Sequence, residues 1–389
     1  MKTIGLVLSR PPAYSETFFN SKIQGLLENG FIVVLFTGPC NETYPHCEHK
    51  KSPKVQKNLF LQLINMFWVG FTLLPYLKTV VNYYKLEKNY GSSSKRIIEK
   101  IYLNSPLLQF RGDWLHYGFA TLAINNEFVA QAVDAKMAVS FRGFDIDVYP
   151  LKHPGCYDLL WQRVDHVHTI STYLIERAYD LGLPKATPFQ KITPAIALET
   201  FPWQSIKTFN TPIKMLTVSR LHWIKGLLET LEALAVLKQK GILFQYTIIG
   251  SGALYESLAF SIHQLDLRDS VVLQGQQAHD VVLQAMHTTD MYLQYSHSEG
   301  FCNAVLEAQG AGALCFVSDG GGLTENIIND QTGWVVPKRQ PSLLAKRLEQ
   351  VIGLTDIEKL KVREQARLHV MSHFGLEEQN KQFILFYQD

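Results

Sequence analysis

Short apolar runs alternate with amphipathic helical patterns along most of the chain, and this alternation constrains the fold more than any other feature. Near the N-terminus, strand patterns at Thr3–Leu8 and Phe31–Thr37 flank a helical pattern at Glu16–Asn29, which Ser15 is placed to cap. A strand, a helix and a strand in this order predict parallel strands joined by crossover helices. We therefore expect an α/β fold.

The same alternation returns in the second half of the chain. The predicted strands are Lys214–Ser219, Phe244–Gly250, Val271–Gln274, Met291–Tyr295 and Leu314–Ser318, and the predicted helices are Gly226–Lys240, Tyr255–Leu265, Asp280–Met286 and Asn303–Gly310. Because 389 residues exceed what one hydrophobic core usually holds, two doubly wound domains are the simplest account. Prolines interrupt Leu198–Thr211, so we place the domains at residues 1–204 and 205–373.

The composition excludes several classes of protein. The 37 basic and 35 acidic residues nearly balance at a net charge of +2, so we expect no nucleic-acid partner. The five cysteines include no CxxC pair, which favours reduced thiols. The first apolar run is too short for the core of a signal peptide, so a cytoplasmic protein is expected.

Residues 59–77 break the alternation, because nearly all of them are apolar and lysines precede and follow them. The length is borderline for a membrane-spanning helix, and Gly70 and Pro75 weaken that interpretation. Two interpretations stay open. The segment lies on the inner membrane surface with a basic rim, or it forms a buried helical hairpin that packs on the domain.

The stretch at residues 296–322 includes two glutamates, Glu299 and Glu307, around the start of a predicted helix. Gly300 allows a ligand to approach the backbone closely, and the first helical amides form a site for an anion or a hydroxyl group. The amides concerned are those of Phe301, Cys302 and Asn303. Either acid alone could have a purely structural role, as a helix cap or as a solvent-facing Glu. Such roles would not explain the combination of acids and glycines in residues 296–322.

Two cations follow the first predicted strand of the second domain. Arg220 comes directly after this strand and Lys225 precedes a helix, so both lie at the carboxyl edge of a parallel sheet, where ligands bind. A guanidinium and an ammonium group suit a diphosphate, although two exposed loop cations are a common alternative. Gly250 and Gly252 follow the next strand, but this G-x-G lacks the third glycine of a dinucleotide fingerprint.

Four motifs together carry a family resemblance. In order they are Ser219-Arg220-Leu221 with Lys225-Gly226, Gly250-Ser251-Gly252, the string from Ser296 to Ala308, and Gly321-Gly322-Leu323-Thr324-Glu325. The chain resembles the retaining glycosyltransferases of family 4, the glycosyl transferases group 1, of the bacterial polysaccharide-assembly type. The resemblance implies the GT-B fold, with two Rossmann-like domains facing each other across a cleft and residues 374–389 crossing back onto the first.

The resemblance also implies roles for these residues. Arg220 and Lys225 would hold the diphosphate of a UDP- or GDP-sugar and stabilise the departing nucleotide. Glu307 would bind the ribose, and Glu299 would contact the donor sugar. Gly250, Gly252 and the backbone at residues 300–303 would complete the donor site. No cofactor and no metal are expected, because the two cations and the helix dipole replace a metal.

The N-terminal half matches the family more loosely. The resemblance places Ser15, Glu16, Arg142 and Asp145 on the acceptor side, and it makes His116 a candidate catalytic residue, with a buried structural histidine as the alternative. Many family members carry histidine where Arg142 stands, and arginine cannot act as a base. Asp145 also begins a DxD string, which we interpret as a coincidence. A structural role is favoured for the strand pair His166 and His168, since two histidines alone rarely bind a metal.

Together these observations predict a retaining, metal-independent glycosyltransferase. It would act on a glycan or lipid-linked glycan in exopolysaccharide or lipopolysaccharide biosynthesis, with residues 59–77 placing it peripherally on the inner membrane. Two alternatives remain: a GT-B epimerase or hydrolase, for which no separate acid and base are evident, and a catalytically silent partner subunit that binds a nucleotide sugar.

Overall fold

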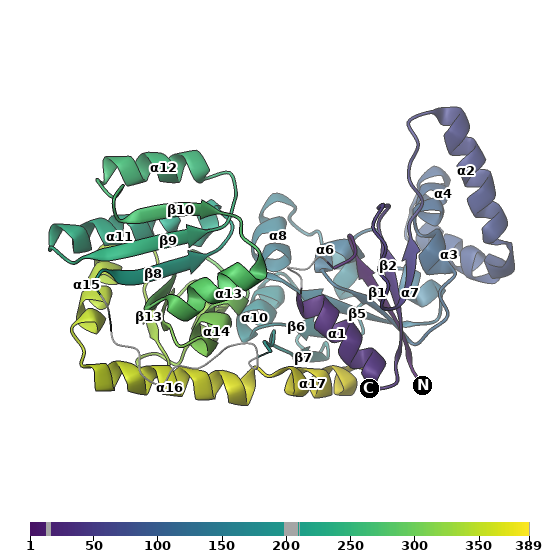
Figure 1. Cartoon of the computed structure of the whole chain (residues 1–389). Coiled ribbons are helices and arrows are strands. Elements are labelled where there is room, and N and C mark those ends of the chain that lie inside the picture. The colour runs from purple at the N-terminus through teal and green to yellow at the C-terminus, as the bar shows by residue number, and fades with distance from the viewer. Residues whose placement is uncertain (13–16, 198–208, 210, 389) are drawn as a thin grey trace. The chain divides into compact units, whose positions relative to one another are not determined.

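The computed structural model describes residues 1–12, 17–197, 209 and 211–388. The chain forms two compact units (Figure 1). The N-terminal unit comprises Met1–Ile192 and Asn380–Asp389, and the C-terminal unit comprises Thr193–Gln379. The predicted boundary at residues 204 and 205 lies outside the described residues. Helix α17 (Leu376–Gln388) begins in the C-terminal unit, but its residues from Asn380 onward belong to the N-terminal unit.

The N-terminal unit is built on a seven-stranded parallel sheet with the order β3-β2-β1-β4-β5-β6-β7. Its strands are β1 (Thr3–Leu8), β2 (Ile32–Thr37), β3 (Glu48–Lys51), β4 (Trp114–Tyr117), β5 (Lys136–Phe141), β6 (His166–Thr169) and β7 (Phe189–Lys191). The first three predicted elements are confirmed within a residue or two, because strands that are buried on both faces read as continuous apolar runs.

Helices connect these strands. They are α1 (Thr17–Glu28), α2 (Leu59–Thr72), α3 (Leu77–Asn89), α4 (Ser94–Leu103), α5 (Ser105–Leu108), α6 (Ala120–Ala123), α7 (Val129–Ala132), α8 (Tyr149–Lys152), α9 (Asp158–Trp161) and α10 (Thr172–Asp180), with a 3-10 turn at Leu74–Tyr76 and a π turn at Phe144–Val148. Helix α1 packs on the sheet through Phe18, Phe19 and Ile23, and the end of α17 adds Phe383 and Phe386 to the same core.

The C-terminal unit has a six-stranded parallel sheet with the order β10-β9-β8-β11-β12-β13. Its strands are β8 (Ile213–Val218), β9 (Phe244–Ile249), β10 (Val271–Gly275), β11 (Met291–Gln294), β12 (Leu314–Ser318) and β13 (Trp334–Val336). Its helices are α11 (Leu227–Gln239), α12 (Tyr255–Gln264), α13 (His279–Thr288), α14 (Asn303–Gly310), α15 (Pro341–Ile352) and α16 (Asp356–His373), with 3-10 turns at Trp223–Lys225 and Gly322–Glu325. The expected pair of doubly wound α/β domains is confirmed.

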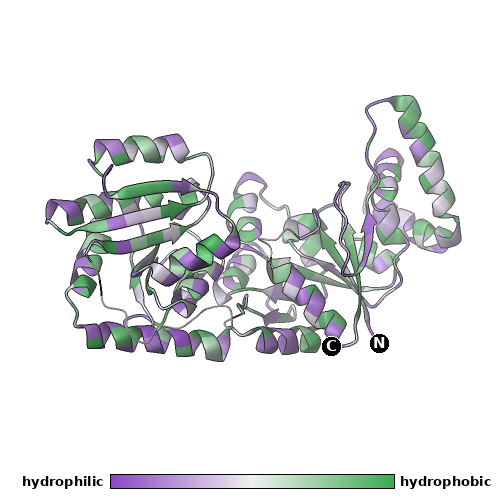
Figure 2. Ribbon diagram, in the orientation of Figure 1, coloured by the Kyte–Doolittle hydropathy of each residue, from purple (hydrophilic) through white to green (hydrophobic). Residues whose placement is uncertain are grey.

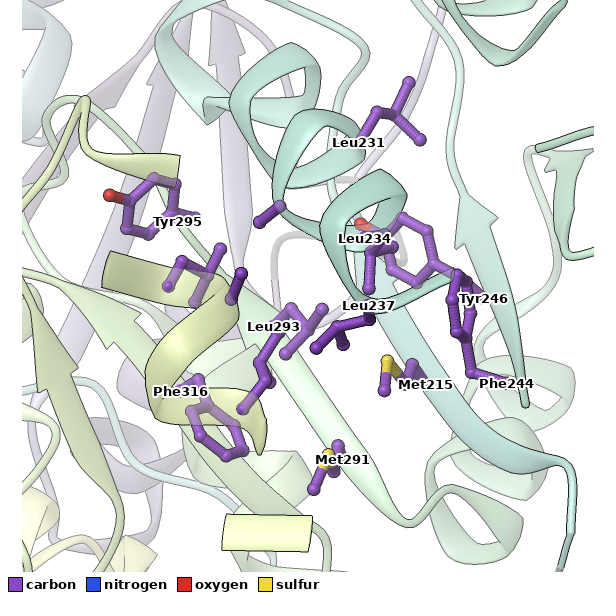
Figure 3. Packing of buried hydrophobic residues seen from close by; sticks show 14 of the residues in the cluster. Met215, Leu231, Leu234, Leu237, Phe244, Tyr246, Met291, Leu293, Tyr295 and Phe316 are labelled. Atoms are coloured by element: carbon purple, nitrogen blue, oxygen red, sulfur yellow. The ribbon is translucent and has the colours of Figure 1, made fainter. Parts of the chain in front are cut away.

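The core of the C-terminal unit shows why its helices lie where they do. Leu231, Leu234 and Leu237 recur at helical spacing on α11 and belong to the same buried cluster as Met215 and Tyr246 of the sheet (Figure 3). Burial of each leucine stabilises the unit by about 1.5–3 kcal/mol. This packing fixes α11 and the loop before it, which carries the predicted cations.

Helix α2 departs from the rest of the N-terminal unit, because none of its residues is buried. Asn58 caps it by accepting hydrogen bonds from the amides of Phe60 and Leu61. The helix stands at the edge of its unit beside α3 and α4 and is coloured as largely hydrophobic (Figure 2). The interpretation of residues 59–77 as a hairpin buried in the domain is therefore wrong for α2.

No single helix in the described part of the chain is both long and apolar enough to cross a membrane. Helix α2 and the helical stretch Leu74–Asn89 meet that test only as a pair, and a bend of 55° separates them.

Candidate functional site

The topology of the C-terminal sheet brings two of the predicted motifs together. Strands β8 and β11 are neighbours at the point where the strand order reverses, and ligands of such sheets bind beyond the carboxyl ends of these strands. Arg220 follows β8 and Glu299 follows β11. Residues far apart in the sequence thus meet at one edge of the sheet.

An ion pair joins the two loops at this edge. The Lys225 ammonium contacts Oε1 of Glu299, and the two side chains are only 13% and 14% exposed. The same oxygen accepts hydrogen bonds from Nε2 of Gln294 at 3.3 Å and from Oγ of Ser296 at 3.0 Å. These neutral donors offset part of the cost of taking the pair out of water. Oε2 of Glu299 accepts no hydrogen bond from the described residues, which leaves it open to a ligand.

Glycines allow the loops to approach one another closely. Gly226 has φ +61°, and a Cβ there would lie 2.0 Å from the carbonyl oxygen of Tyr295. Gly250 has φ +149°, and its Cβ would lie 1.8 Å from the carbonyl oxygen of Ser219. Gly252 lies in the same way against Leu221. The glycines of the K-G and G-x-G motifs therefore pack the backbone around Arg220 and Lys225.

The Gly-Gly motif pairs with the backbone of Glu299. The Glu299 amide donates to the carbonyl oxygen of Gly320 at 3.1 Å, and the Gly322 amide donates to the carbonyl oxygen of Glu299 at 2.7 Å. A Cβ at Gly320 would lie 2.3 Å from the carbonyl oxygen of Ser296. This pairing holds the Glu299 loop against the end of β12.

The start of α14 corrects one expectation. The Cys302 amide donates to Oδ1 of Asn326 at 3.1 Å, and Nδ2 of Asn326 donates back to the Cys302 carbonyl oxygen at 3.0 Å. The Cys302 amide is thus occupied and unavailable to an anion. Among the described residues, the amides of Phe301 and Asn303 meet no acceptor, and the buried Gly300 places them beside Glu299.

Glu307 lies in the second turn of α14, and its side chain is 17% exposed. Its Oε1 accepts a hydrogen bond from Nε2 of His279, the first residue of α13, at 3.3 Å. This hydrogen bond raises the pKa of His279 above its ordinary value. Arg220 is exposed, and its guanidinium bonds to no described residue.

These residues form one polar edge that can accept a phosphorylated ligand. Arg220 offers a guanidinium that bonds to none of the described residues, Lys225 offers an ammonium group, and Glu299 and Glu307 offer carboxylate oxygens to hydroxyl groups. Sequence motifs mark these residues but not the residues that hold the site in place: His279 beside Glu307, Gln294 beside Glu299 and Asn326 beside Cys302. None of the three belongs to a motif, and only the folded topology brings them to the site.

His116 of β4 lies in the core of the N-terminal unit with no exposed surface. A hydrogen-bonded chain runs through it. His168 Nε2 donates to the carbonyl oxygen of Ile192, Ser140 Oγ links His168 Nδ1 to His116 Nε2 at 2.7 Å on each side, and the Tyr387 hydroxyl donates to His116 Nδ1. The prediction that His116 is catalytic is not supported, because a residue so enclosed cannot touch a substrate.

Burial favours the neutral form of both histidines, which makes the N-terminal unit sensitive to acid. Burial, together with the charge of Lys22, lowers the pKa values of His116 and His168. Below about pH 6.5 the unfolded chain binds protons that the folded unit does not, so stability should fall by up to about 1.4 kcal/mol per pH unit for each histidine. Burial raises the pKa of Asp145 to about 6. Between about pH 4 and 6 the folded unit therefore binds a proton that the unfolded chain does not, which offsets the loss of stability from one histidine.

Urea unfolding at about pH 7.5 and about pH 5.5 measures this difference. We expect His168→Asn to reduce the pH dependence, whereas the exposed His46→Asn should keep it. Equal stability of the wild type at both pH values would contradict the account.

The acceptor-side residues have structural partners in the N-terminal unit. Oδ1 of Asp145 accepts from the Thr121 hydroxyl at 3.0 Å and Oδ2 accepts from the Ala120 amide at 3.3 Å, so the carboxylate caps α6 from a fully buried position. The Arg142 guanidinium lies 4.0 Å from the ring centroid of Phe18. Ser15 and Glu16 lie outside the described residues.

Metal ligands do not gather in the described part of the chain. No group of three or more His, Cys, Asp or Glu residues there could hold a metal ion. His166 stacks on Phe386 at 4.3 Å, and Asp147 of the DxD string accepts from the Tyr173 hydroxyl at 2.9 Å. All five cysteines are free.

Residues 202–369 match the family model of the glycosyl transferases group 1. A relative in Escherichia coli strain K12, provisionally named a colanic acid biosynthesis glycosyltransferase, WcaL, is 26% identical over 402 residues, which cover 97% of this chain and 98% of the relative. The amylovoran biosynthesis glycosyltransferase AmsK of Erwinia amylovora is 27% identical over 298 residues, or 72% of this chain and 73% of that protein.

The fold is also that of solved glycosyltransferase structures. The crystal structure of Anabaena HepE in complex with UDP and glucose superposes with a TM-score of 0.70 over 99% of this chain and 98% of HepE, at 14% identity. The expected GT-B fold, with two parallel-sheet α/β units, is confirmed. The chain therefore carries a glycosyl transferases group 1 domain in its C-terminal half and has the fold of the GT-B glycosyltransferases.

Proposed function

We propose that the protein is a retaining glycosyltransferase that moves a sugar from a UDP- or GDP-sugar to a glycan or lipid-linked glycan. The observation that carries the proposal is the polar edge beyond β8 and β11, where Lys225 pairs with Glu299 and the loop after β8 exposes Arg220. The assigned pathways of WcaL and AmsK favour exopolysaccharide or lipopolysaccharide assembly.

In this proposal the bond between the anomeric carbon and the donor phosphate breaks as a bond to an acceptor hydroxyl oxygen forms. The hydroxyl proton passes to an oxygen of the departing phosphate, and the nucleoside diphosphate leaves. Arg220 and Lys225 stabilise the negative charge that develops on the departing phosphate. Glu307 accepts from the ribose hydroxyls, and Oε2 of Glu299 accepts from a hydroxyl of the donor sugar.

The reaction needs no metal in this proposal, because the two cations and the N-terminus of α14 supply the positive charge. Gly250 and Gly252 keep the loop of Arg220 in place, and Gly300, Phe301 and Asn303 line the sugar side. We further propose that the protein works peripherally at the inner membrane surface, where lipid-linked acceptors lie, through residues 59–77.

A panel of UDP- and GDP-sugars and free nucleotides tests the donor site by thermal denaturation. A ligand that binds only the native state raises the melting temperature. At a ligand concentration a hundredfold above its Kd, the free energy of unfolding rises by about 2.7 kcal/mol. We expect one nucleotide sugar to give the shift and Arg220→Ala to remove it.

The silent partner subunit remains the competing function, because Arg142 stands where many family members carry histidine. A thermal shift without sugar transfer to a lipid-linked glycan would favour that subunit. The absence of a shift with every nucleotide sugar would overturn the proposed donor site.

A further inference from the structure

Helices α2 and α3 expose a large apolar surface. Five large side chains of α2 are each at least 61% exposed: Leu59, Phe60, Phe67, Trp68 and Phe71. Leu74, Leu77 and Val81 continue the surface around the bend onto α3, with 49–53% of each side chain exposed. A soluble monomer rarely exposes an apolar patch of this size without a partner to cover it.

The charge around this surface identifies the kind of partner. Residues 50–100 contain ten Lys or Arg against two Asp or Glu, which gives a net charge of +8. One of the two acids, Glu87, is buried and paired with Lys100 at 2.7 Å. So strong a charge of one sign opposes the pairing of two copies through this face, whereas it attracts an anionic lipid surface.

Helix α3 combines both properties on one face. Thr79, Tyr83 and Glu87 point into the unit and are buried. The exposed face carries Lys78, Lys85 and Lys88 next to Leu77 and Val81. Lysines in this arrangement extend their amines to lipid phosphates while their methylene chains cover apolar surface. The 55° bend before α3 suits a helix pair that lies along a membrane rather than across it.

A groove of about 990 Å³ opens beside the exposed face of α3. Lys78, Lys85 and Arg111 line it, against a single carboxylate, Asp134. Nη1 of Arg111 donates to the Phe110 carbonyl oxygen at 3.0 Å and to Thr79 Oγ1 at 3.4 Å. These contacts orient the guanidinium, which can bind a phosphate group through two parallel hydrogen bonds.

We propose that this surface binds a bilayer containing anionic phospholipid, with α2 among the outer acyl chains and a lipid phosphate in the groove of Lys78, Lys85 and Arg111. The inference deepens the proposed function, on whose membrane placement it rests, by naming the lipid. It requires no nucleotide sugar, so the two proposals can be tested separately.

Co-sedimentation of the full chain with vesicles tests the inference. We expect the wild type to bind vesicles with about a third phosphatidylglycerol at least tenfold more tightly than pure phosphatidylcholine vesicles. Lys78→Gln with Lys85→Gln should weaken binding to the anionic vesicles about ten- to thirtyfold. The matched control, Lys152→Gln with Lys185→Gln, removes two exposed lysines elsewhere in the unit and should bind like the wild type.

The apolar contribution has its own variant. Replacement of Phe67, Trp68 and Phe71 by serine should abolish binding to both kinds of vesicle, with an unchanged melting temperature because all three side chains are exposed. Loss of binding in the control double variant, or equal binding to neutral and anionic vesicles, would overturn the lipid selectivity.

Two further outcomes would replace the lipid with another occupant. Competition by inorganic phosphate for vesicle binding would assign the groove to free phosphate. Failure of the wild type to sediment, together with a dimer that the serine variant converts to a monomer, would assign the surface to a second copy of the chain. Vesicle binding without any thermal shift by nucleotide sugars would refute the proposed donor site and leave this inference standing.

Discussion

Replacement of Lys225 by alanine should lower kcat/KM for sugar transfer by about 10²–10³-fold. The ammonium group is held at the carboxyl edge of the sheet by Glu299, and in the proposed reaction it faces the phosphate that acquires negative charge. Stabilisation of charge that develops only in the transition state acts on kcat. Initial rates at saturating acceptor and varied donor measure the effect.

The same change leaves Glu299 partly buried without its cation, which can itself destabilise the unit. Melting temperatures of the variant and the wild type separate this effect from lost catalysis. Lys238→Ala is the matched control, since it breaks a second ion pair of the C-terminal unit, with Asp266 at 2.9 Å on the surface. We expect the control to keep its transfer rate. A Lys225→Ala enzyme that is folded and fully active would exclude Lys225 from the reaction.

Phe386→Ala should destabilise the N-terminal unit by about 3–5 kcal/mol, although the residue lies at the end of the chain. Phe386 is fully buried, its ring stacks on His166 at 4.3 Å, and it lies 6.0 Å from Trp114. Removal of the ring leaves a cavity between α17 and the sheet. Urea unfolding followed by tryptophan fluorescence should show a lower midpoint for the transition of the N-terminal unit.

The adjacent Leu385 provides the control for this prediction. Its side chain is 56% exposed on the same helix, so Leu385→Ala should change stability by no more than about 0.5 kcal/mol. Equal effects of the two substitutions would mean that α17 does not form part of the core of the N-terminal unit.

Much of the fold could be predicted because parallel strands are buried on both faces. The strands Thr3–Leu8 and Leu314–Ser318 are therefore mainly apolar, and glycines mark several helix ends. The exposure of α2 could not be predicted, because an apolar helix has the same composition whether protein or another apolar medium covers it.

The candidate site was only partly predictable for a similar reason. Motif order identified Arg220, Lys225, Glu299 and Glu307, but their partners depend on which strands are neighbours. The hydrogen bond of His279 to Glu307 joins α13 to α14, and no local sequence pattern predicts it. The role of His116 stayed open between catalysis and structure, because a polar residue on a strand gives the same sequence pattern in either case.

The most direct test of the central claim is transfer of a labelled sugar. The protein is incubated with labelled UDP- and GDP-sugars and a crude extract of lipid-linked glycans, and the anomeric configuration of the product is determined by NMR. The account predicts that label from one donor enters the glycan with its anomeric configuration retained, and that Arg220→Ala abolishes the incorporation. Release of free labelled sugar alone, or an inverted linkage, would contradict it.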